Sequence, residues 1–368
     1  MRHDQPILHT GSYLDLASND YLRMSRHPAV IAAASQALKD WGTGARSSRV
    51  VTGTFPVHHS FEHSLSDYLH APAALVFSSG YTANLAAITT FVPDNSLLIC
   101  DVRNHASLID ACRLAGIDKH IIDVDDVCEL QNALRSCKNQ VPVVVCDAVD
   151  SVTGKILNIP AIYELTTAAG GMLITDNAHG LGVWGATGSG PFPELYGSTL
   201  YRESQNLIVT CTLSKALGAQ GGAIVCSEHQ RSILVNRART FIFDTALSPA
   251  MAAAATASLQ IICEKPHIIG QLHRVAKDLQ GSLCAACVDY TQCASAASTP
   301  IIYIPVGSPD KARFTAKKLK KQGILVGCFT PPSVQWRASG VRLTLHPHLT
   351  TEHIEYVTQA IVAAFGSD

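Results

Sequence analysis

Short apolar runs alternate with longer amphipathic stretches along the middle of the chain, from about residue 73 to residue 226. The apolar runs predict strands at residues 74–77, 97–100, 120–124, 141–146, 172–175, 207–211 and 222–226. The stretches between them predict helices that include residues 81–91, 106–114, 127–135 and 161–169. This alternation is typical of an α/β sheet with mainly parallel strands. Ligands of such sheets bind beyond the carboxyl ends of the strands, so polar residues at those ends are the first candidates for a site.

The pattern changes after about residue 249. Two helical segments lead to a strand at 301–305, a helix at 312–321, short strands at 324–326 and 341–345, and a last helix at 351–365. This order predicts a smaller α+β domain. We therefore expect three parts, at residues 1–42, 43–248 and 249–368. The first is a segment whose helix at 28–41 packs on the small domain or bridges the two, and the second is the large domain.

Composition limits the classes of protein to which the chain can belong. Of its 368 residues, 47% are apolar and 15% are charged, and the net charge is −1. Nothing provides the basic surface that nucleic acid requires. The alanine-rich run 246–263 favours a packed helix over a membrane span, and residues 1–6 have no signal-peptide core. Cysteines inside predicted strands suit a reducing compartment, so we expect a cytoplasmic protein that binds neither nucleic acid nor a membrane.

Lys215 is the strongest candidate for a catalytic residue. It follows the predicted strand 207–211, and Asp176 and His179 follow the strand 172–175. An amine, a carboxylate and an imidazole at strand ends suit pyridoxal 5′-phosphate (PLP), since the lysine can form a Schiff base and the carboxylate can pair with the pyridine nitrogen. The imidazole can donate to the phenolic oxygen. A surface lysine and a simple hydrogen bond within a loop are the competing explanations.

Small and hydroxyl-bearing residues are candidate contacts for the phosphate. Ser79, Gly80 and Tyr81 follow the first strand and open a helix, where free N–H groups and the helix dipole favour an anion. Ordinary capping by Ser79 would also explain this pattern. Thr212 and Ser214 precede the candidate lysine, and their hydroxyls can bind phosphate oxygens.

Three further residues have candidate roles against the ring or the substrate. His105 comes just before the helix 106–114, and its flat ring would stack on one face of the pyridine. Ala178 is small enough to lie against the opposite face. Arg342 lies in an apolar strand and needs an anionic partner, which either a substrate carboxylate or a structural carboxylate would provide.

Three other motifs are weaker indications of function. Residues 180–185 match the dinucleotide fingerprint, but the glycines and prolines that follow oppose the helix that such a site needs. His59-Ser-Phe-Glu-His63 matches a zinc pattern without an evident third ligand, and Cys284-Ala-Ala-Cys287 has no second pair. We therefore expect no metal site.

Seven ordered motifs together resemble those of the α-oxoamine synthases, the fold-type I PLP enzymes that condense an amino acid with an acyl thioester. They span residues 18–22, 42–49, 79–84, 104–107, 176–180, 212–215 and 342–344. The resemblance implies a PLP-dependent aminotransferase-like fold of type I. A mainly parallel seven-stranded sheet would lie in the large domain, next in the chain to a smaller α+β C-terminal domain.

The resemblance also implies roles for single residues. Lys215 would carry the cofactor and move protons, Asp176 would meet the pyridine nitrogen, and His105 would stack on the ring and polarise the thioester. The other residues that would line the cofactor and its phosphate are Ser79, Gly80, Tyr81, Ser151, Ala178, His179, Thr212, Ser214 and, across a homodimer interface, Thr245. The residues that would contact the substrate are Asn19, Ser333 and Arg342, the last of which would hold the amino-acid carboxylate.

The stretch 42–49 is most similar to the family member of the biotin pathway. That enzyme condenses L-alanine with pimeloyl-CoA, or with the same acyl group on acyl carrier protein, and releases CO₂. Glycine with acetyl-CoA or with succinyl-CoA is the alternative substrate pair. A non-catalytic subunit is a further alternative, although Lys215, Asp176 and His179 are all retained.

The chain departs from the family pattern at four places. Asn177 stands where the family commonly has an acid, the segment Ser151-Val-Thr-Gly-Lys155 lacks two acids, and Arg23 replaces a usual glycine. Only a dozen residues precede Tyr13, so we expect the family's N-terminal helix and its substrate-binding arginine to be missing. These differences concern recognition of the acyl donor more than the chemistry of PLP.

Overall fold

The structure, a computed structural model, describes residues 13–192, 204–290 and 299–365. It divides into two compact units. The large unit comprises Asp20–Ser151 and Lys155–Gln271, and the small unit comprises Met1–Asn19, Val152–Gly154 and Leu272–Asp368. The first twelve residues, for which we expected neither a signal peptide nor an N-terminal helix, lie outside the described residues.

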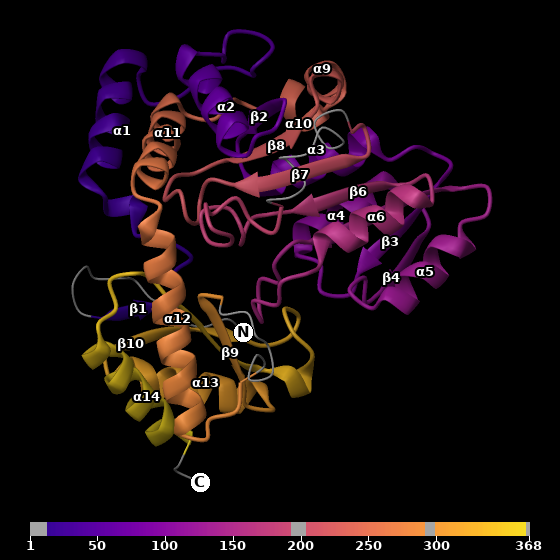
Figure 1. Cartoon of the computed structure of the whole chain (residues 1–368). Helices are drawn as coiled ribbons and strands as arrows, with labels where there is room; N and C mark the ends of the chain where they lie inside the picture. The colour runs from indigo at the N-terminus through magenta and orange to yellow at the C-terminus, as the bar shows by residue number, and fades with distance from the viewer. Residues whose placement is uncertain (1–12, 193–203, 291–298, 366–368) are drawn as a thin grey trace. The chain divides into compact units, whose positions relative to one another are not determined.

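A seven-stranded sheet forms the centre of the large unit (Figure 1). The strands lie in the order β2-β8-β7-β6-β5-β3-β4. Their bounds are β2 (Ala73–Phe77), β3 (Ser96–Asp101), β4 (Lys119–Ile122), β5 (Val141–Asp147), β6 (Met172–Asp176), β7 (Leu207–Thr212) and β8 (Gly222–Cys226). Neighbours in this sheet are parallel, except that β8 is antiparallel to β2 and β7. The predicted fold class is therefore confirmed.

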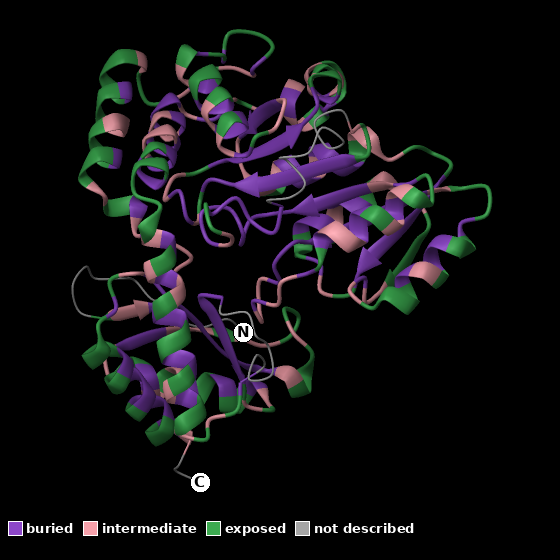
Figure 2. Ribbon diagram, viewed as in Figure 1, coloured by how far each residue is buried: buried purple, intermediate pink, exposed green. Residues whose placement is uncertain are grey.

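Helices pack on this sheet and share an apolar core with it. Their bounds are α2 (Pro56–Tyr68), α3 (Gly80–Phe91), α4 (Ala106–Ala115), α5 (Val127–Ser136), α6 (Ile159–Ala168), α9 (Glu228–Arg237) and α10 (Arg239–Ile242). Alternate strand residues such as Val143 and Val145 meet α3, α4, α9 and α10 in one buried cluster, and Figure 2 shows the strands of this sheet as mostly buried, apart from the edge strand β4. Burying each such side chain contributes roughly 1.5–3 kcal/mol. Among the described helices, none is long and apolar enough to cross a membrane.

The helices that follow β2 and β3 begin with side-chain caps. The hydroxyl of Ser79 accepts the N–H of Thr82 at 3.1 Å, and the Thr82 hydroxyl accepts the N–H of Ser79 at 3.1 Å. At the start of α4, Nδ1 of His105 accepts the N–H of Ser107 at 3.2 Å. These caps end each strand-to-helix loop close to the carboxyl end of its strand.

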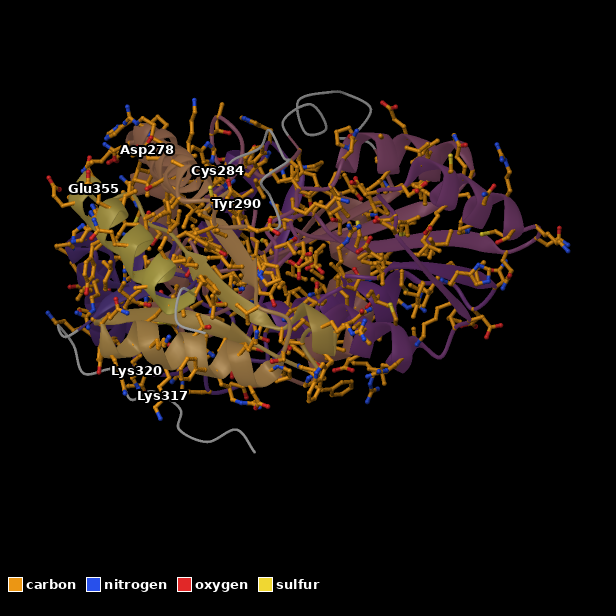
Figure 3. All side chains as sticks on the ribbon, turned by 90° about the horizontal axis from the view of Figure 1, so that it is seen from below. Asp278, Cys284, Tyr290, Lys317, Lys320 and Glu355 are labelled. Carbon is orange, nitrogen blue, oxygen red and sulfur yellow. The ribbon has the colours of Figure 1, made fainter. Side chains whose placement is uncertain are left out.

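The small unit has its own four-stranded sheet, in the order β1-β10-β11-β9. Its elements are β1 (Leu14–Leu16), β9 (Ile301–Pro305), β10 (Ile324–Phe329), β11 (Gly340–Thr344), α13 (Pro309–Lys321), α14 (Thr351–Phe365) and most of α12 (His267–Ala285), which begins in the large unit. In α13, Ala312 and Leu319 are buried, whereas Lys317 and Lys320 are exposed (Figure 3). Helical spacing of these residues gives α13 one apolar and one charged face.

The observed units differ from the expected domains at two places. Helix α1 (Pro28–Trp41) was expected to pack on the small domain or to bridge the two domains, but it packs on α11 (Pro249–Glu264) within the large unit. Helix α11 was expected to begin the small domain, yet it packs on α1 and α2. Its buried alanines, among them Ala252 and Ala255, allow close helix contacts that residue periodicity alone does not assign to a domain. Of the expected N-terminal segment, β1 belongs to the small unit, where it pairs with β10.

Candidate active site

Lys215 lies in the turn after β7, where its amine contacts a buried imidazole. The Nζ atom is 2.8 Å from Nε2 of His179. The other ring nitrogen, Nδ1, lies 2.7 Å from the hydroxyl of Tyr21. The exposed fractions of Tyr21 and His179 are 1% and 4%. Two residues that the sequence placed at neighbouring strand ends therefore lie together, and a third residue, which the sequence analysis did not propose, extends the pair.

A glycine brings the N-terminal part of the large unit against this turn. Gly218 has a φ of +60°, and a Cβ atom added there would lie 2.2 Å from the backbone nitrogen of Ser25. A side chain at position 218 would thus be strained and would also collide with the segment that carries Tyr21. Gly182 makes a similar close approach, since its added Cβ would lie 2.7 Å from Cβ of Ala216.

Asp176, at the end of β6, is buried and accepts two hydrogen bonds. Its Oδ1 accepts the N–H of Ala178 at 2.8 Å, and its Oδ2 accepts the side-chain amide of Asn84 at 2.7 Å. The same amide nitrogen donates to Ser107 at 2.8 Å, and the Asn84 oxygen accepts from the hydroxyl of Thr210 at 2.5 Å. This network fixes both oxygens of the carboxylate.

His105 shares this end of the sheet with Asp176 and Lys215. Its backbone N–H donates to Oδ2 of Asp147 at 2.7 Å, and its Nδ1 lies 2.7 Å from the Ser107 hydroxyl. Burial lowers the pKa of His105, the charge of Asp176 raises it, and the charge of Lys215 lowers it further. The lowered pKa means that the imidazole favours its neutral form.

Two carboxyl groups stand side by side at the ends of β5 and β6. The sheet register pairs Asp147 with Asp176. Burial and then the charge of Asp176 raise the pKa of Asp147 well above its usual value, against the lowering effect of the His105 N–H. Of the two residues, Asp176 is thus the one available to hold a cation.

The candidate phosphate contacts surround the start of α3. A Cβ added to Gly80 would lie 3.1 Å from Cβ of Thr212, so the helix start lies directly against the end of β7. The hydroxyls of Thr212 and Ser214 are 2.8 Å apart. The side chain of Tyr81 is exposed, and its hydroxyl donates to Asp110. Hydroxyls and helix N–H groups therefore converge at one place, as an anion site requires.

Other candidate residues of the large unit lie nearer the surface. Ser151 is half-buried in the turn after β5, and Thr245 is exposed. The residue before it, Asp244, accepts a hydrogen bond from the hydroxyl of Ser78, which directly precedes the cap of α3. The segment that carries Thr245 thus contacts the loop between β2 and α3.

The candidate substrate residues belong to the small unit. Nη2 of Arg342, in β11, donates to Oδ1 of Asn19 at 2.9 Å, and the guanidinium lies 4.7 Å from the ring centre of Phe329. Arg342 is 6% exposed. Ser333 is exposed, in the turn between β10 and β11. Arg342 and Asn19, which are 323 positions apart in the chain, therefore meet as one polar pair.

The residues of the large unit fit PLP. Asp176 is 6% exposed, and its described partners are neutral N–H donors. No lysine or arginine in the described part of the chain forms a salt bridge with it. A buried carboxylate of this kind is costly unless a cation meets it, and a protonated pyridine nitrogen is such a cation. The amine of Lys215 and the hydroxyls near α3 supply the other contacts that the cofactor needs.

The weaker motifs have structural explanations. Residues 180–185 form turns. Glu62 forms a buried ion pair with Arg49 at 2.8 Å and contacts His59 at 3.2 Å. The described residues contain no group of three or more histidine, cysteine or acidic side chains placed to hold a metal ion.

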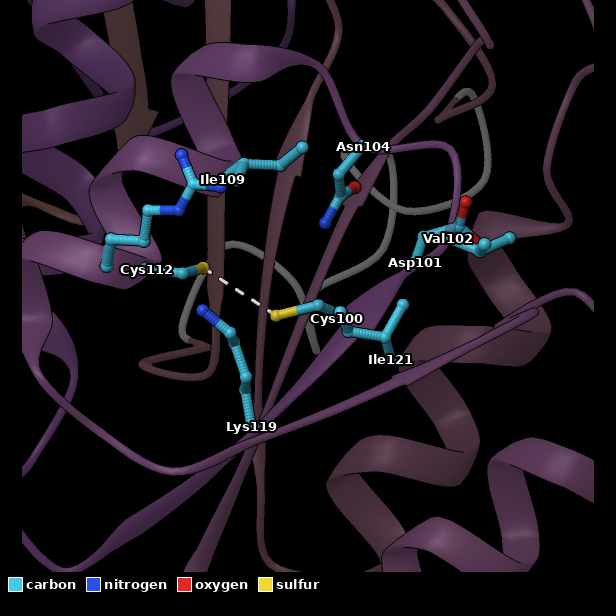
Figure 4. A pocket seen from close by; sticks show the side chains of 9 residues that line it. Cys100, Asp101, Val102, Asn104, Ile109, Cys112, Lys119 and Ile121 are labelled. Atoms are coloured by element: carbon cyan, nitrogen blue, oxygen red, sulfur yellow. Dashed lines mark hydrogen bonds between the residues drawn. The ribbon is translucent and has the colours of Figure 1, made fainter. Parts of the chain in front are cut away.

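A separate cavity of about 220 Å³ lies between β3, β4 and α4 (Figure 4). Cys100 and Cys112 line it with their sulfurs 3.7 Å apart, beside the amine of Lys119. Neither Lys215 nor Asp176 lines this cavity. It is therefore not part of the candidate active site.

Sequence reasoning missed three residues of the site. Tyr21 and Asn84 stood inside motifs used for the resemblance, but neither received a role. Asp147 directly follows the predicted strand 141–146, the same signal that identified Asp176, and was not considered. An inventory of every polar residue at a strand end would have found Asp147, whereas the contacts of Tyr21 and Asn84 join segments 158 and 92 positions apart.

Comparisons with known proteins identify the family of the chain. The family model for aminotransferase class I and II matches residues 12–361. The chain is 40% identical over 344 residues to the 8-amino-7-oxononanoate synthase of Mycolicibacterium vanbaalenii. The aligned region covers 94% of this chain and 87% of that protein. It is also 40% identical over 348 residues to the 8-amino-7-oxononanoate synthase of Mycobacterium tuberculosis, with 95% and 87% covered.

Solved structures of related enzymes have the same fold. Serine palmitoyltransferase from Sphingomonas wittichii matches with a TM-score of 0.88 at 27% identity, over 96% of this chain and 87% of that chain. A high-resolution structure of SPT with PLP also has a TM-score of 0.88. The 8-amino-7-oxononanoate synthase from Francisella tularensis matches with a TM-score of 0.80 at 25% identity, over 96% and 97% of the two chains.

Proposed function

Because the chain belongs to the class I and II aminotransferase family, and within it to the α-oxoamine synthases, we propose that it condenses L-alanine with a pimeloyl thioester to give 8-amino-7-oxononanoate and CO₂. The chain is a PLP-dependent enzyme. Relatives about 40% identical over nearly the whole chain carry the name of this synthase, which supports the choice of substrates. The acyl group would arrive on CoA or on acyl carrier protein.

The cofactor and the protein would share the chemistry. When bound, PLP supplies an electron sink that makes the proton on the amino-acid Cα easier to remove. Lys215 would hold the cofactor through its amine and would then carry that proton. Asp176 would meet the pyridine nitrogen, and the hydrogen bonds from Asn84 and Ala178 would keep its carboxylate oriented.

The remaining large-unit residues would position the ring and its phosphate. His179 would donate to the ring oxygen, His105 would stack on one face, and Ala178 would lie on the other. The phosphate would bind at the start of α3, with contacts from Ser79, Gly80, Tyr81, Ser151, Thr212 and Ser214. Thr245 would reach the phosphate of a second copy in a cytoplasmic homodimer, which is consistent with its exposure in the single chain.

Arg342 would bind the carboxylate of the amino acid. Its guanidinium can form two parallel hydrogen bonds with a carboxylate. In the small unit it donates to the neutral amide oxygen of Asn19, which a negatively charged carboxylate can replace or join. Ser333 would contact the substrate from the exposed turn between β10 and β11.

The single observation that carries the proposal is the contact of the Lys215 amine with His179 in the same unit as the buried Asp176. The test begins with Lys215→Ala, with Lys265→Ala, at an exposed position, as the control. We expect purified wild-type protein with PLP to show a visible absorption band and to make 8-amino-7-oxononanoate, detected by mass. Lys215→Ala should lose both, and the control should keep both.

The same assay separates the possible substrates. Alanine, glycine and serine are each supplied with pimeloyl-CoA, acetyl-CoA and succinyl-CoA, and the products are identified by mass. Alanine with pimeloyl-CoA should give the fastest turnover. Faster turnover of glycine with acetyl-CoA or succinyl-CoA would replace the proposed substrates, and a Lys215→Ala variant that retains full activity would contradict the proposed chemistry.

A further inference from the structure

Three side chains form a buried hydrogen-bonded row that ends at Lys215. The hydroxyl of Tyr21 lies 2.7 Å from Nδ1 of His179, and Nε2 of the same ring lies 2.8 Å from the lysine amine. The rings of Tyr21 and His179 meet edge to face, with centres 6.1 Å apart and planes at 71°. Both ring nitrogens of His179 are therefore engaged, one by a phenol and one by an amine.

The state of such an imidazole depends on which groups donate. A neutral histidine carries one N–H, so one ring nitrogen donates and the other accepts. If the phenol donates to Nδ1, the proton of the ring lies on Nε2 and points toward Lys215, as it can when that amine is neutral or bound to the cofactor, whereas a charged amine would donate to Nε2 and leave the ring proton on Nδ1. If Nδ1 carries the proton, Nε2 has only a lone pair on that side and cannot donate to anything there.

We propose that Tyr21 is a positioning residue that donates its hydroxyl proton to Nδ1 of His179 and so holds the imidazole in the form protonated on Nε2. This proposal rests on the proposed function, in which His179 donates from Nε2 to the ring oxygen of PLP. A phenol donates readily to a neutral imidazole, since it is the stronger acid. Tyr21 thus acts on the cofactor through the histidine and not by direct contact.

Packing around the tyrosine fixes the geometry. The segment that carries it lies against the lysine turn so closely that only glycine fits at position 218, where an added Cβ would lie 2.2 Å from the nitrogen of Ser25. The next residue, Leu22, lies 3.7 Å from the Cβ that would be added to Gly182, in the turn that follows His179. The segment that directly follows Tyr21 therefore packs against the two turns that present Lys215 and His179.

The test uses Tyr21→Phe, which removes one oxygen and keeps the ring. Tyr163→Phe is the matched control, because Tyr163 is also a buried tyrosine of the large unit and its hydroxyl lies 2.6 Å from that of Ser204. The first readout is the affinity of each apoprotein for PLP. Loss of one buried hydrogen bond should weaken binding by roughly 3- to 10-fold in Tyr21→Phe, with no change in the control.

A second readout does not depend on the cofactor. Nitrogen-15 NMR of histidine-labelled apoprotein that carries Lys215→Ala reports which ring nitrogen carries the proton when no ammonium can donate to Nε2, and the signal of His179 is assigned by its loss in His179→Gln. We expect the form protonated on Nε2 in this protein and after adding Tyr163→Phe. A mixture of the two forms is expected after adding Tyr21→Phe. A His179 protonated on Nδ1 in the Lys215→Ala protein would overturn the proposal even if the Tyr21 variant failed to fold.

A double variant separates positioning from general stability. In the His179→Gln background, Tyr21→Phe should weaken PLP binding no further, because the hydroxyl acts only through the imidazole. An additional loss of similar size in this background would show a role independent of His179. If wild-type protein shows no visible band that depends on Lys215, the proposed function fails, whereas the tautomer measured in the apoprotein still tests the role of Tyr21.

Discussion

The residues proposed to hold the cofactor and those proposed to hold the amino acid are organised differently. In the large unit, Asp176, Asn84 and His179 are buried, and each makes hydrogen bonds to other polar side chains or backbone groups of that unit. In the small unit, Arg342 donates to the neutral amide of Asn19, and Ser333 is exposed. One set is arranged before any ligand binds, and the other must exchange partners when the substrate arrives.

This difference indicates which residues contribute most to the free energy of ligand binding. A preorganised carboxylate with fixed N–H donors stabilises a cation without rearrangement. An arginine that already donates to a neutral oxygen loses part of that hydrogen bond when a substrate carboxylate takes the place of the oxygen. The net contribution of the arginine to substrate binding is therefore smaller. We therefore expect substitutions in the large-unit network to have larger effects than those at the substrate residues.

The largest effect is expected from Asp176→Asn, which removes the charge and keeps the size of the side chain. Loss of one member of a buried charge pair costs about 3–5 kcal/mol, so kcat/KM should fall by roughly 10²- to 10⁴-fold. Steady-state kinetics with alanine and pimeloyl-CoA would measure this fall. Asp118→Asn, at an exposed position, should leave the rate unchanged. A loss of less than about 10-fold at position 176 would contradict the assigned pairing with the cofactor.

The large unit also holds a buried histidine whose neutrality can be tested by pH. His58 accepts the N–H of Phe55 at Nδ1, so Nε2 donates to the carbonyl of Leu247 at 2.7 Å. Burial lowers the pKa of His58 from 6.5 to about 4. The unfolded chain therefore binds a proton that the folded chain does not between about pH 6.5 and pH 4.

Stability should fall as the pH falls through this window and should change no further below it on account of His58. The loss amounts to at most roughly 3 kcal/mol. Urea denaturation at several pH values would measure it. His58→Gln should be less stable at pH 7, because it loses hydrogen bonds, but should show a smaller drop between about pH 6.5 and pH 4. The exposed His120→Gln serves as the control and should keep the wild-type dependence.

A smaller effect is expected from Arg342→Lys, which keeps the charge but loses the planar fork. Charge-assisted hydrogen bonds contribute about 1.5–3 kcal/mol, so KM for alanine should rise roughly 10- to 100-fold with little change in affinity for PLP. Kinetics at varied alanine concentration would measure the rise. The exposed Arg313→Lys provides the comparison. If PLP affinity fell as much as KM rose, Arg342 would belong with the cofactor residues and the contrast between the two sets would fail.

Ser333→Ala should have the smallest effect. An exposed neutral hydroxyl contributes about 0.5–1.5 kcal/mol, so kcat/KM should fall by no more than roughly 10-fold. Competition between alanine and glycine under initial-rate conditions would show whether the change alters substrate choice. A fall in kcat/KM as large as that of Asp176→Asn would mean that Ser333 is as preorganised in the active enzyme as the cofactor residues.

Much of the large unit could be predicted from local patterns. Most strands were found because their residues are apolar on both faces, as in β5, and the strand ends then identified Lys215 and Asp176. The edges of the elements shifted by a few residues because helix caps, such as Ser79, set them. The direction of β8 could not be predicted, since an antiparallel strand with both faces buried has the same composition as a parallel one.

Long-range contacts were the part that sequence could not supply. Helix α1 carries a pattern that would suit either unit, and only its packing on α11 assigns it to the large one. The contact of Tyr21 with His179 spans 158 positions and involves a tyrosine that would otherwise count as an ordinary core residue. The hydrogen bond between Arg342 and Asn19 could not be predicted from the sequence either, because β10 lies between β1 and β11 in the sheet of the small unit.

The register of the central sheet has a consequence for how the enzyme handles charge. Asp147 and Asp176 stand opposite each other at the ends of adjacent strands, and the environment favours the protonated form of Asp147. The N–H groups of Asn84 and Ala178 that point at Asp176 favour negative charge on that residue. A single cation that enters this end of the sheet is therefore balanced by one carboxylate, without a second negative charge beside it.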